Sequence, residues 1–148
     1  MKKISVSIPC YNEEKNVESA YGVLKNTMKS LKKYDYELIF TDNGSADNTR
    51  QLIQRIAKRD KKVKGVFLSR NFGPESSGRA GLDYSTGDAY VGISCDLQDP
   101  PELIKKFIDK WENGYDIVLG VYKSAEERGI MKFFRSFFYT LFNKIANI

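Results

Sequence analysis

The sequence contains no histidine and only two cysteines, Cys10 and Cys95. Without histidine it cannot form a serine–histidine or cysteine–histidine nucleophile system, nor a zinc site with histidine ligands. The two cysteines are far apart and lack CxxC spacing, so we expect buried free thiols rather than a structural disulfide. Acid–base or metal chemistry in this chain therefore has to use carboxylates.

Glycine-rich phosphate loops and a secretory leader are missing too. Neither GxGxxG nor GxxxxGKS/T occurs, which argues against NAD-type and P-loop nucleotide sites. The N-terminal segment MKKISVSIPCYNEE has only a short apolar stretch before its acids, which predicts a cytosolic protein.

The net charge of +5 would suit nucleic acid, anionic lipid or a phosphorylated substrate and does not choose among them. A length of 148 residues with 41% hydrophobic content is typical of one globular domain.

Apolar, β-prone runs alternate with segments of helical periodicity along most of the chain. We expect strands at residues 4–9, 36–41, 63–69, 89–95 and 116–121, and helices at about 13–31, around 52–57, at 74–85 and from 100 to 111. This alternation predicts a doubly wound, mainly parallel α/β sheet of the Rossmann-like type, with helices on both faces. Such sheets bind ligands beyond the carboxyl ends of their strands.

Two polar segments follow the first two expected strands. In the segment Tyr11-Asn12-Glu13, the tyrosine ring could stack on or flank a nucleobase. The segment equally suits a polar loop whose acidic residues are favoured by the dipole at a helix N-terminus. Asp42, in the segment TDNGS, is our choice for a hydrogen bond to a nucleobase or ribose. The Asn-Gly-Ser pattern is by itself typical of an ordinary turn.

The segment from Asp96 to Glu102 follows the fourth expected strand and is the most informative one. Carboxylates at the exposed end of a strand suit a hard cation such as Mg²⁺ or Mn²⁺, which would be shared with a diphosphate. The alternative is a helix start, with Asp99 as N-cap and Glu102 in the first turn. Both interpretations hold if Asp99 and Glu102 cap the helix while Asp96 points to the metal.

The C-terminal segment has a different pattern. Residues 131–148 place phenylalanine, leucine and isoleucine on one helical face and lysine, arginine and other polar residues on the opposite face. Such a helix is too polar on one side to span a bilayer. It fits either the membrane interface or packing on the sheet or on another subunit, which would favour a homo-oligomer. We therefore divide the chain into a domain, 1–125, and an amphipathic helix, 126–148.

Four ordered segments, PCYNEEKNV, FTDNGSADNT, LSRNFG with AGLDYSTGDA, and CDLQDPPELI, resemble the family-two GT-A glycosyltransferases. The resemblance covers about residues 4–121 and points to the branch that transfers sugars from nucleotide donors to polyprenyl phosphate. It implies a nucleotide-sugar-binding GT-A domain. Within the resemblance, the form of the segment CDLQDPPELI favours UDP-sugars over GDP-sugars. Many relatives continue into an acceptor-side segment and membrane helices, so we expect the fold to be incomplete at its C-terminus.

The resemblance also implies roles for single residues. It places Pro9, Tyr11, Glu13 and Asp42 in the nucleotide pocket, and we add Asn12, Asn43, Gly44 and Cys95 from the same segments. Asp96 is then the metal-side carboxylate of a DxD-type motif, Gln98 and Asp99 line the donor-sugar side, and Arg70 and Asn71 order the site. Ser94 and Asn43 stand where relatives usually carry an acid, and Tyr122 where they often carry an arginine.

The resemblance implies an inverting transfer by one displacement, assisted by Mg²⁺ or Mn²⁺, at the cytoplasmic face of a membrane. A hydroxyl acceptor would need a base, for which Asp99 is the candidate, whereas a lipid phosphate needs none because it is already anionic. No nucleic-acid partner is expected. Two alternatives stay open: a nucleotidyltransferase that makes nucleotide sugars, and a degenerate, membrane-associated nucleotide-sugar-binding module without turnover.

Overall fold

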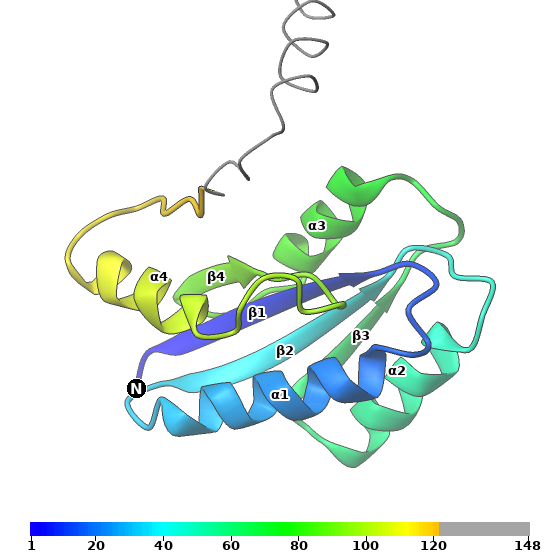
Figure 1. The fold of residues 1–148 in the computed structure, drawn as a ribbon, viewed down its shortest axis with the longest axis horizontal. Coiled ribbons are helices and arrows are strands. Elements are labelled where there is room, and N and C mark those ends of the chain that lie inside the picture. The colour runs from blue at the N-terminus through cyan, green and yellow to red at the C-terminus, as the bar shows by residue number, and fades with distance from the viewer. Residues whose placement is uncertain (122–148) are drawn as a thin grey trace, which may run out of the picture. The chain divides into compact units, whose positions relative to one another are not determined.

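The computed structural model describes residues 1–121, and Figure 1 shows their arrangement. Four strands form one parallel sheet in the order β3-β2-β1-β4. The strands are β1 (Lys3–Cys10), β2 (Asp35–Asp42), β3 (Val63–Phe67) and β4 (Ala89–Gly92). The helices that alternate with them are α1 (Val17–Ser30), α2 (Thr49–Arg59), α3 (Pro74–Asp83) and α4 (Leu103–Glu112). This arrangement confirms the doubly wound α/β fold that the sequence predicted.

The chain runs from β1 outward to β2 and β3 and then returns past β1 to β4. Helices α1, α2 and α4 cover one face of the sheet, whereas α3, which connects β3 to β4, covers the other (Figure 1). The strand order therefore reverses between β1 and β4. In doubly wound sheets, the carboxyl ends of the strands at such a switch point are where ligands bind.

The face under α1, α2 and α4 holds the hydrophobic core. Alternate residues of β1, namely Ile4, Val6 and Ile8, are completely buried, and Leu38 and Phe40 of β2 belong to the same layer. The buried positions of the helices recur at helical spacing: Val17, Ala20, Leu24 and Met28 in α1, Ile53 and Ile56 in α2, and Ile104 and Ile108 in α4. Removing these apolar side chains from water stabilises the fold.

The opposite face, under α3, is polar. The polar side chains that β1 and β2 bury on it are Ser5, Ser7, Glu37 and Thr41. Glu37 accepts hydrogen bonds from the ammonium groups of Lys3 at 2.8 Å and Lys64 at 2.9 Å. Burial raises the pKa of Glu37, but these hydrogen bonds and ion pairs outweigh it and hold the pKa well below its ordinary value. This buried carboxylate is therefore charged and paired in the folded protein.

Helix α3 packs closely on this polar face. A Cβ atom on Gly81 would lie only 2.1 Å from Ser7 Oγ. The helix can therefore lie this close to β1 because Gly81 has no side chain. Within residues 1–121, the hydroxyls of Ser7 and Thr41 are buried there without a hydrogen-bond partner. The buried residues of α3 itself are Ser77 and Gly81. The residues that α3 itself buries are therefore small, although Ile39 of β2, between Glu37 and Thr41, is completely buried on the same face.

Several element ends differ from the sequence prediction. The expected fifth strand at 116–121 is not formed: no strand pairs with these residues in the described part of the chain, and Ile117 is 78% exposed. An apolar, β-prone run without a hydrogen-bonding neighbour does not make a strand. Strands β3 and β4 end at Phe67 and Gly92, earlier than expected. Helix α1 begins at Val17, because residues 13–16 form a turn.

Within residues 1–121, no helix has both the length and the apolar character that crossing a bilayer requires. Residues Met1–Val118 form one compact unit. The predicted domain boundary at residue 125, the amphipathic helix at 126–148 and Tyr122 lie outside the described residues, and what we expect of them stays a prediction.

Candidate functional site

A cavity of about 270 Å³ lies at the carboxyl edge of the sheet, where β1 ends. Its walls come from the β1–α1 loop, the residue after β2, the β3–α3 loop and the start of α3. The lining residues are Pro9, Cys10, Tyr11, Glu13, Asn43, Asn71, Pro74 and Ser77. Tyr11 is 46% exposed, so its ring is accessible to a ligand. The cavity therefore occupies the position at which doubly wound sheets bind ligands.

Asn12 joins the β1–α1 loop to the β2–α2 loop. Its φ of 56° lies in the left-handed region, which asparagine tolerates better than most residues. Its backbone N–H donates to Ser45 Oγ at 2.9 Å, and its side-chain oxygen accepts from the N–H of Ala46 at 2.9 Å. The next residue, Glu13, donates its backbone N–H to Thr49 Oγ1 at 2.7 Å. Asn12 thus positions the wall of the cavity without lining it.

Asp42 lies beneath the cavity and does not line it. Its carboxylate is completely buried, with one oxygen accepting from Arg50 Nε at 2.9 Å and the other from the N–H of Ser45 at 3.0 Å. Arg50 also donates to the carbonyl of Leu68 at 2.7 Å. The structure therefore gives Asp42 a buried ion pair, and does not place it for the contact to a nucleobase or ribose that we expected. Arg50 was missed by the sequence analysis.

Asn43, the next residue, is on the wall of the cavity. Its Nδ2 donates to Asn71 Oδ1 at 3.1 Å and to the carbonyl of Gly73 at 3.0 Å, while its Oδ1 accepts from the N–H of Phe72 at 3.0 Å. One amide thus holds the β3–α3 loop against the end of β2. An aspartate at this position could not donate two of these hydrogen bonds. The geometry gives a structural reason for asparagine where the resemblance leads one to expect an acid.

Gly44 allows the same two loops to approach each other. Its φ is 74°, and a Cβ atom there would lie 2.4 Å from the carbonyl carbon of Arg70. The Arg70 guanidinium lies over the ring of Phe72, 4.2 Å from its centre. Neither Gly44 nor Arg70 lines the cavity. Gly44 and Arg70 lie in the loops beside the cavity, and the roles expected of both stay predictions.

Asp96 projects from the turn that follows β4. Its side chain is exposed, and one carboxylate oxygen accepts from the N–H of Gln98 at 3.1 Å. Leu97, with a φ of 56°, makes this turn sharp. The other Asp96 oxygen has no hydrogen bond within this turn. Among residues 1–121, no group of three or more histidine, cysteine, aspartate or glutamate side chains could hold a metal ion. A cation at Asp96 would therefore take its other ligands from a phosphate and from water.

Asp99, in the same turn, accepts a hydrogen bond from Ser94 Oγ at 3.2 Å. Helix α4 begins later, at Leu103, and its N-cap residue Glu102 makes no side-chain capping hydrogen bond. The structure therefore gives Glu102 no capping hydrogen bond. Ser94 and Asp99 instead fasten the two ends of the turn that presents Asp96.

Cys10 and Cys95 connect the Asp96 turn to the wall of the cavity. The ladder between β1 and β4 continues past the end of β4, where the N–H of Ile93 donates to the carbonyl of Ser7 at 3.0 Å. Hydrogen bonding to the Cys95 thiol and burial raise the pKa of Cys10 well above its ordinary value. Both cysteines are free and buried, as predicted. Because the Cys10 thiol stays protonated, it packs against its neighbours and is not a nucleophile.

The structure thus brings part of the predicted site together. Four predicted nucleotide-binding residues and one predicted site-ordering residue line the cavity, namely Pro9, Tyr11, Glu13, Asn43 and Asn71. The predicted residues that do not line it are Asn12, Asp42, Gly44, Cys95, Arg70, Asp96, Gln98 and Asp99. The lining residues that the sequence analysis missed are Cys10, Pro74 and Ser77. The Gly73-Pro74 helix start was the only sequence signal for the contribution of α3. The binding roles of these residues stay predictions.

A doubly wound parallel sheet with a cavity at its carboxyl edge, where β1 ends, is typical of α/β domains that bind ligands at this edge. The model of the family described as glycosyl transferase family 2 matches residues 5–145, and the chain belongs to this family. It is 40% identical over 146 residues to a prophage bactoprenol glucosyl transferase homolog of Escherichia coli K12, covering 98% of this chain and 47% of that protein. It is 39% identical over 145 residues to the bactoprenol glucosyl transferase of Shigella phage SfX, with 97% and 47% covered. The chain spans about half the length of these curated relatives.

Two solved structures show the same fold. The glucosyl-3-phosphoglycerate synthase of Mycobacterium tuberculosis, in complex with Mn²⁺, UDP and glucosyl-3-phosphoglycerate, has a TM-score of 0.58 and 28% identity, covering 78% of this chain and 42% of that one. A mannosyltransferase from Pyrobaculum calidifontis, in complex with GDP-Man and Mn²⁺, has a TM-score of 0.57 and 21% identity, with 67% and 33% covered. The described residues therefore have the GT-A type of fold.

Proposed function

We propose that this chain binds a nucleoside diphosphate sugar and serves an enzyme that transfers the sugar to a polyprenyl phosphate. The observation that carries the proposal is the cavity at the carboxyl edge of the sheet, with the exposed Tyr11 ring on its wall, while the segment that leads to Asp96 is hydrogen-bonded to β1 through Ile93. An aromatic and polar wall suits a base and a ribose. A neighbouring carboxylate suits a cation shared with a diphosphate.

The relatives support the acceptor and the donor of this proposal. Bactoprenol, in the names of the Escherichia coli and Shigella phage relatives, is a polyprenyl lipid. The synthase structure at 28% identity contains UDP and Mn²⁺. We therefore propose a UDP-sugar in preference to a GDP-sugar, and a site of action at the cytoplasmic face of a membrane.

Three lining residues have groups available for the nucleoside. Tyr11 offers its exposed ring to one side of the base. Glu13 uses one carboxylate oxygen to accept from Asn16 Nδ2 at 2.6 Å, so the other oxygen can accept from a ribose hydroxyl. Asn71 accepts with its Oδ1 from Asn43 and from its own loop, which leaves its Nδ2 to donate to the ligand. We propose these three as the residues that contact the nucleoside.

Asp96 is the residue that would hold a divalent cation, Mg²⁺ or Mn²⁺. Its exposed carboxylate is a hard oxygen donor, and Mg²⁺ commonly binds proteins through one or two carboxylates together with phosphates and water. Bound there, a cation would neutralise the charge that develops on the leaving diphosphate. The lone carboxylate of this turn therefore fits a cation that arrives with the nucleotide.

The acceptor explains how the reaction runs without a histidine. In the proposed step, an oxygen of the polyprenyl phosphate forms a bond to the anomeric carbon while the bond from that carbon to the diphosphate breaks. The nucleoside diphosphate leaves with the electron pair, and one displacement inverts the anomeric centre. The phosphate is already anionic at neutral pH, so no proton has to be removed. With this acceptor Asp99 is not needed as a base and holds the turn through Ser94.

Calorimetric titration of the full chain with UDP, GDP and their sugars, with and without Mn²⁺, tests the donor site. We expect UDP to bind more tightly than GDP, and Mn²⁺ to strengthen the binding of both. Asp96→Asn should lose the gain from Mn²⁺, whereas Asp109→Asn, the same change at an exposed position of α4, should keep it. If no nucleotide binds under any of these conditions, the donor-site proposal is wrong.

Transfer is tested separately from binding. Radiolabelled UDP-sugar is incubated with undecaprenyl phosphate in vesicles, and label that becomes soluble in organic solvent measures product. Label transfer that depends on both substrates supports the enzyme. Nucleotide binding without transfer, by the chain and by the corresponding longer protein, would favour a binding module without turnover.

A further inference from the structure

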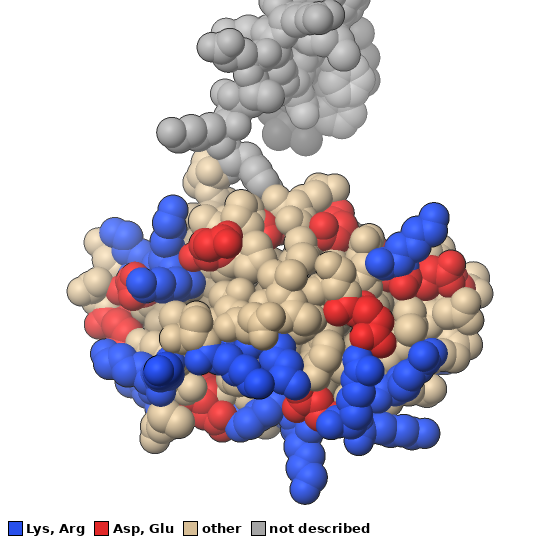
Figure 2. Space-filling view, turned by 60° about the horizontal axis from the view of Figure 1, so that its bottom comes forward, with Lys and Arg blue, Asp and Glu red and all other residues tan. Residues whose placement is uncertain are grey.

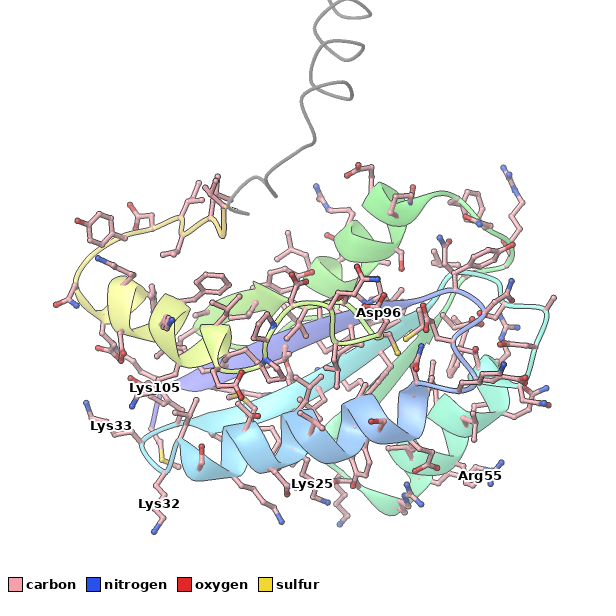
Figure 3. All side chains as sticks on the ribbon, in the orientation of Figure 1. Lys25, Lys32, Lys33, Arg55, Asp96 and Lys105 are labelled. Carbon is pink, nitrogen blue, oxygen red and sulfur yellow. The ribbon has the colours of Figure 1, made fainter. Side chains whose placement is uncertain are left out.

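A set of exposed cations lies on helices α1 and α2, on the turn before α1 and on the turns that follow both helices. We define the α1–α2 basic face as Lys15, Lys29, Lys32, Lys33, Arg55, Lys58 and Lys61, all of which are exposed. Figure 2 brings the side of α1 and α2 toward the viewer and shows lysine and arginine side chains gathered along it. Figure 3 shows Lys32, Lys33 and Arg55 pointing outward from this side, while Asp96 lies apart from them over the sheet.

The acids near this face are already engaged, so they do not neutralise it. Four of them pair with other cations: Glu18 with Arg59, Asp35 with Lys62, Asp42 with Arg50, and Asp60 with Lys25. Asp47 accepts from the backbone N–H groups of Glu14 and Thr49. Within the described residues, no member of the basic face forms an ion pair. Its positive charge is therefore available to an external partner.

The surface has no apolar centre. Among the exposed large hydrophobic residues of the described chain, only Val23 comes from α1 or α2, and it is 38% exposed. Protein interfaces of ordinary affinity have a buried core in which aromatic and apolar residues are enriched and lysine is depleted. A layer of anionic headgroups needs only clustered positive charge within a Debye length of it. The composition of this face fits a lipid surface better than a folded protein partner.

The orientation of α1 relates this face to the candidate site. The β1–α1 loop, with Glu13, lines the cavity, and α1 runs from there to Lys32 and Lys33 at the opposite edge of the sheet. A protein lying on the basic face would therefore have the cavity at the rim of its footprint. A phosphate in the headgroup layer would then approach the cavity from the side.

We propose that the α1–α2 basic face binds the anionic headgroups of a membrane. The inference extends the proposed function, because it supplies the surface from which a lipid phosphate would reach the site. Each cation near an anionic membrane contributes about 1 kcal/mol, a factor of about five in affinity. Neutralising two of them should therefore weaken vesicle binding roughly 25-fold.

Co-sedimentation with vesicles tests this inference. The full chain is used, so that any contribution of its other residues to vesicle binding is the same in every variant. Vesicles of phosphatidylcholine with 30% phosphatidylglycerol, about one anionic lipid in three, are compared with pure phosphatidylcholine. The test variants are Arg55→Gln/Lys58→Gln and Lys29→Gln/Lys32→Gln. The matched control, Lys106→Gln/Lys110→Gln, removes the same charge from exposed positions of α4. Circular dichroism checks that each variant is folded.

We expect both test variants to bind the anionic vesicles at least tenfold more weakly than the wild type, and the control to change less than threefold. The difference should vanish near 1 M salt, where the Debye length is about 3 Å. Equal losses in test and control variants would overturn the inference, since net charge alone would explain them. Equal wild-type binding to both kinds of vesicle would overturn it too and would leave an acidic protein as the partner class. UDP affinity, measured on the same variants, should not change, so failure here is distinguishable from failure of the donor site.

Discussion

Replacing Ser7 by alanine should stabilise the protein, although it removes only one oxygen atom. Ser7 is completely buried under α3, and its hydroxyl has no hydrogen-bond partner among the described residues. A buried polar group without a partner costs about 1 to 3 kcal/mol in desolvation. We therefore expect Ser7→Ala to raise the free energy of unfolding by about 1 kcal/mol.

Gly81→Ala tests the same contact from the side of the helix. The new methyl group would lie 2.1 Å from Ser7 Oγ and 3.3 Å from Thr41 Oγ1. Alanine gains about 1 kcal/mol in helix propensity, whereas overpacking costs about 1 to 3 kcal/mol. In the wild type the balance should be a loss of up to about 2 kcal/mol. With Ser7→Ala the nearest atom is the Ser7 Cβ at 3.1 Å, so the same substitution should cost at least about 1 kcal/mol less.

Urea denaturation of the wild type, the two single variants and the double variant gives the coupling free energy. Gly78→Ala is the control on the same helix, because a Cβ there meets no atom within 4 Å. It should gain up to about 1 kcal/mol from helix propensity alone. A loss of stability in Ser7→Ala, or single changes that add within about 0.5 kcal/mol, would refute the reasoning.

Three further predictions concern the loops around the cavity and the buried charges. Gly44→Ala combines a left-handed backbone with a methyl group 2.4 Å from a backbone carbon, so it should destabilise by roughly 2 to 5 kcal/mol in urea denaturation. Arg50→Ala leaves the buried Asp42 carboxylate with the N–H of Ser45 but without its cation; because Arg50 is 39% exposed, the loss should be that of a charged hydrogen bond, about 1.5 to 3 kcal/mol, whereas the exposed Arg55→Ala should stay within about 0.5 kcal/mol. Because the pKa of Glu37 is depressed in the folded state, its contribution is present above the unfolded pKa of about 4.5 and is lost as the pH falls below it. Unfolding free energies measured between pH 7 and pH 3 should therefore fall more steeply in the wild type than in Glu37→Gln.

The order and type of the elements could be predicted from the sequence, because the spacing of apolar residues reflects which side chains of each element are buried. One core buries both the alternate residues of β1 and a stripe of α1, namely Val17, Ala20, Leu24 and Met28. The type of each element could therefore be predicted from its own residues. Residues 116–121 are also an apolar, β-prone run, yet they form no strand in the structure. A strand depends on a neighbour that supplies hydrogen bonds, and the local sequence does not contain that information.

The site was harder to predict than the fold, because its side chains are placed by contacts between distant loops. Spacing located the segment that contains Asp42 and Asn43, but it could not show which of the two side chains is on the wall. The ion pair with Arg50 buries the carboxylate, and three hydrogen bonds fix the amide at the wall. Ser77 reaches the cavity from α3 on the other face of the sheet, and no pattern around β1 or β2 indicates that.

The unequal faces of the sheet have a consequence for how the cavity responds to a ligand. One wall begins at Cys10, a buried member of the apolar core cluster, and should open only with the whole domain. The wall formed by α3 rests on serine, threonine and glycine, which bury little apolar area. Elements that bury little apolar area have low free energies of local unfolding and separate first as cooperative units. The site therefore joins a rigid half to an adjustable half, and a ligand that touches both would favour the closed arrangement of α3.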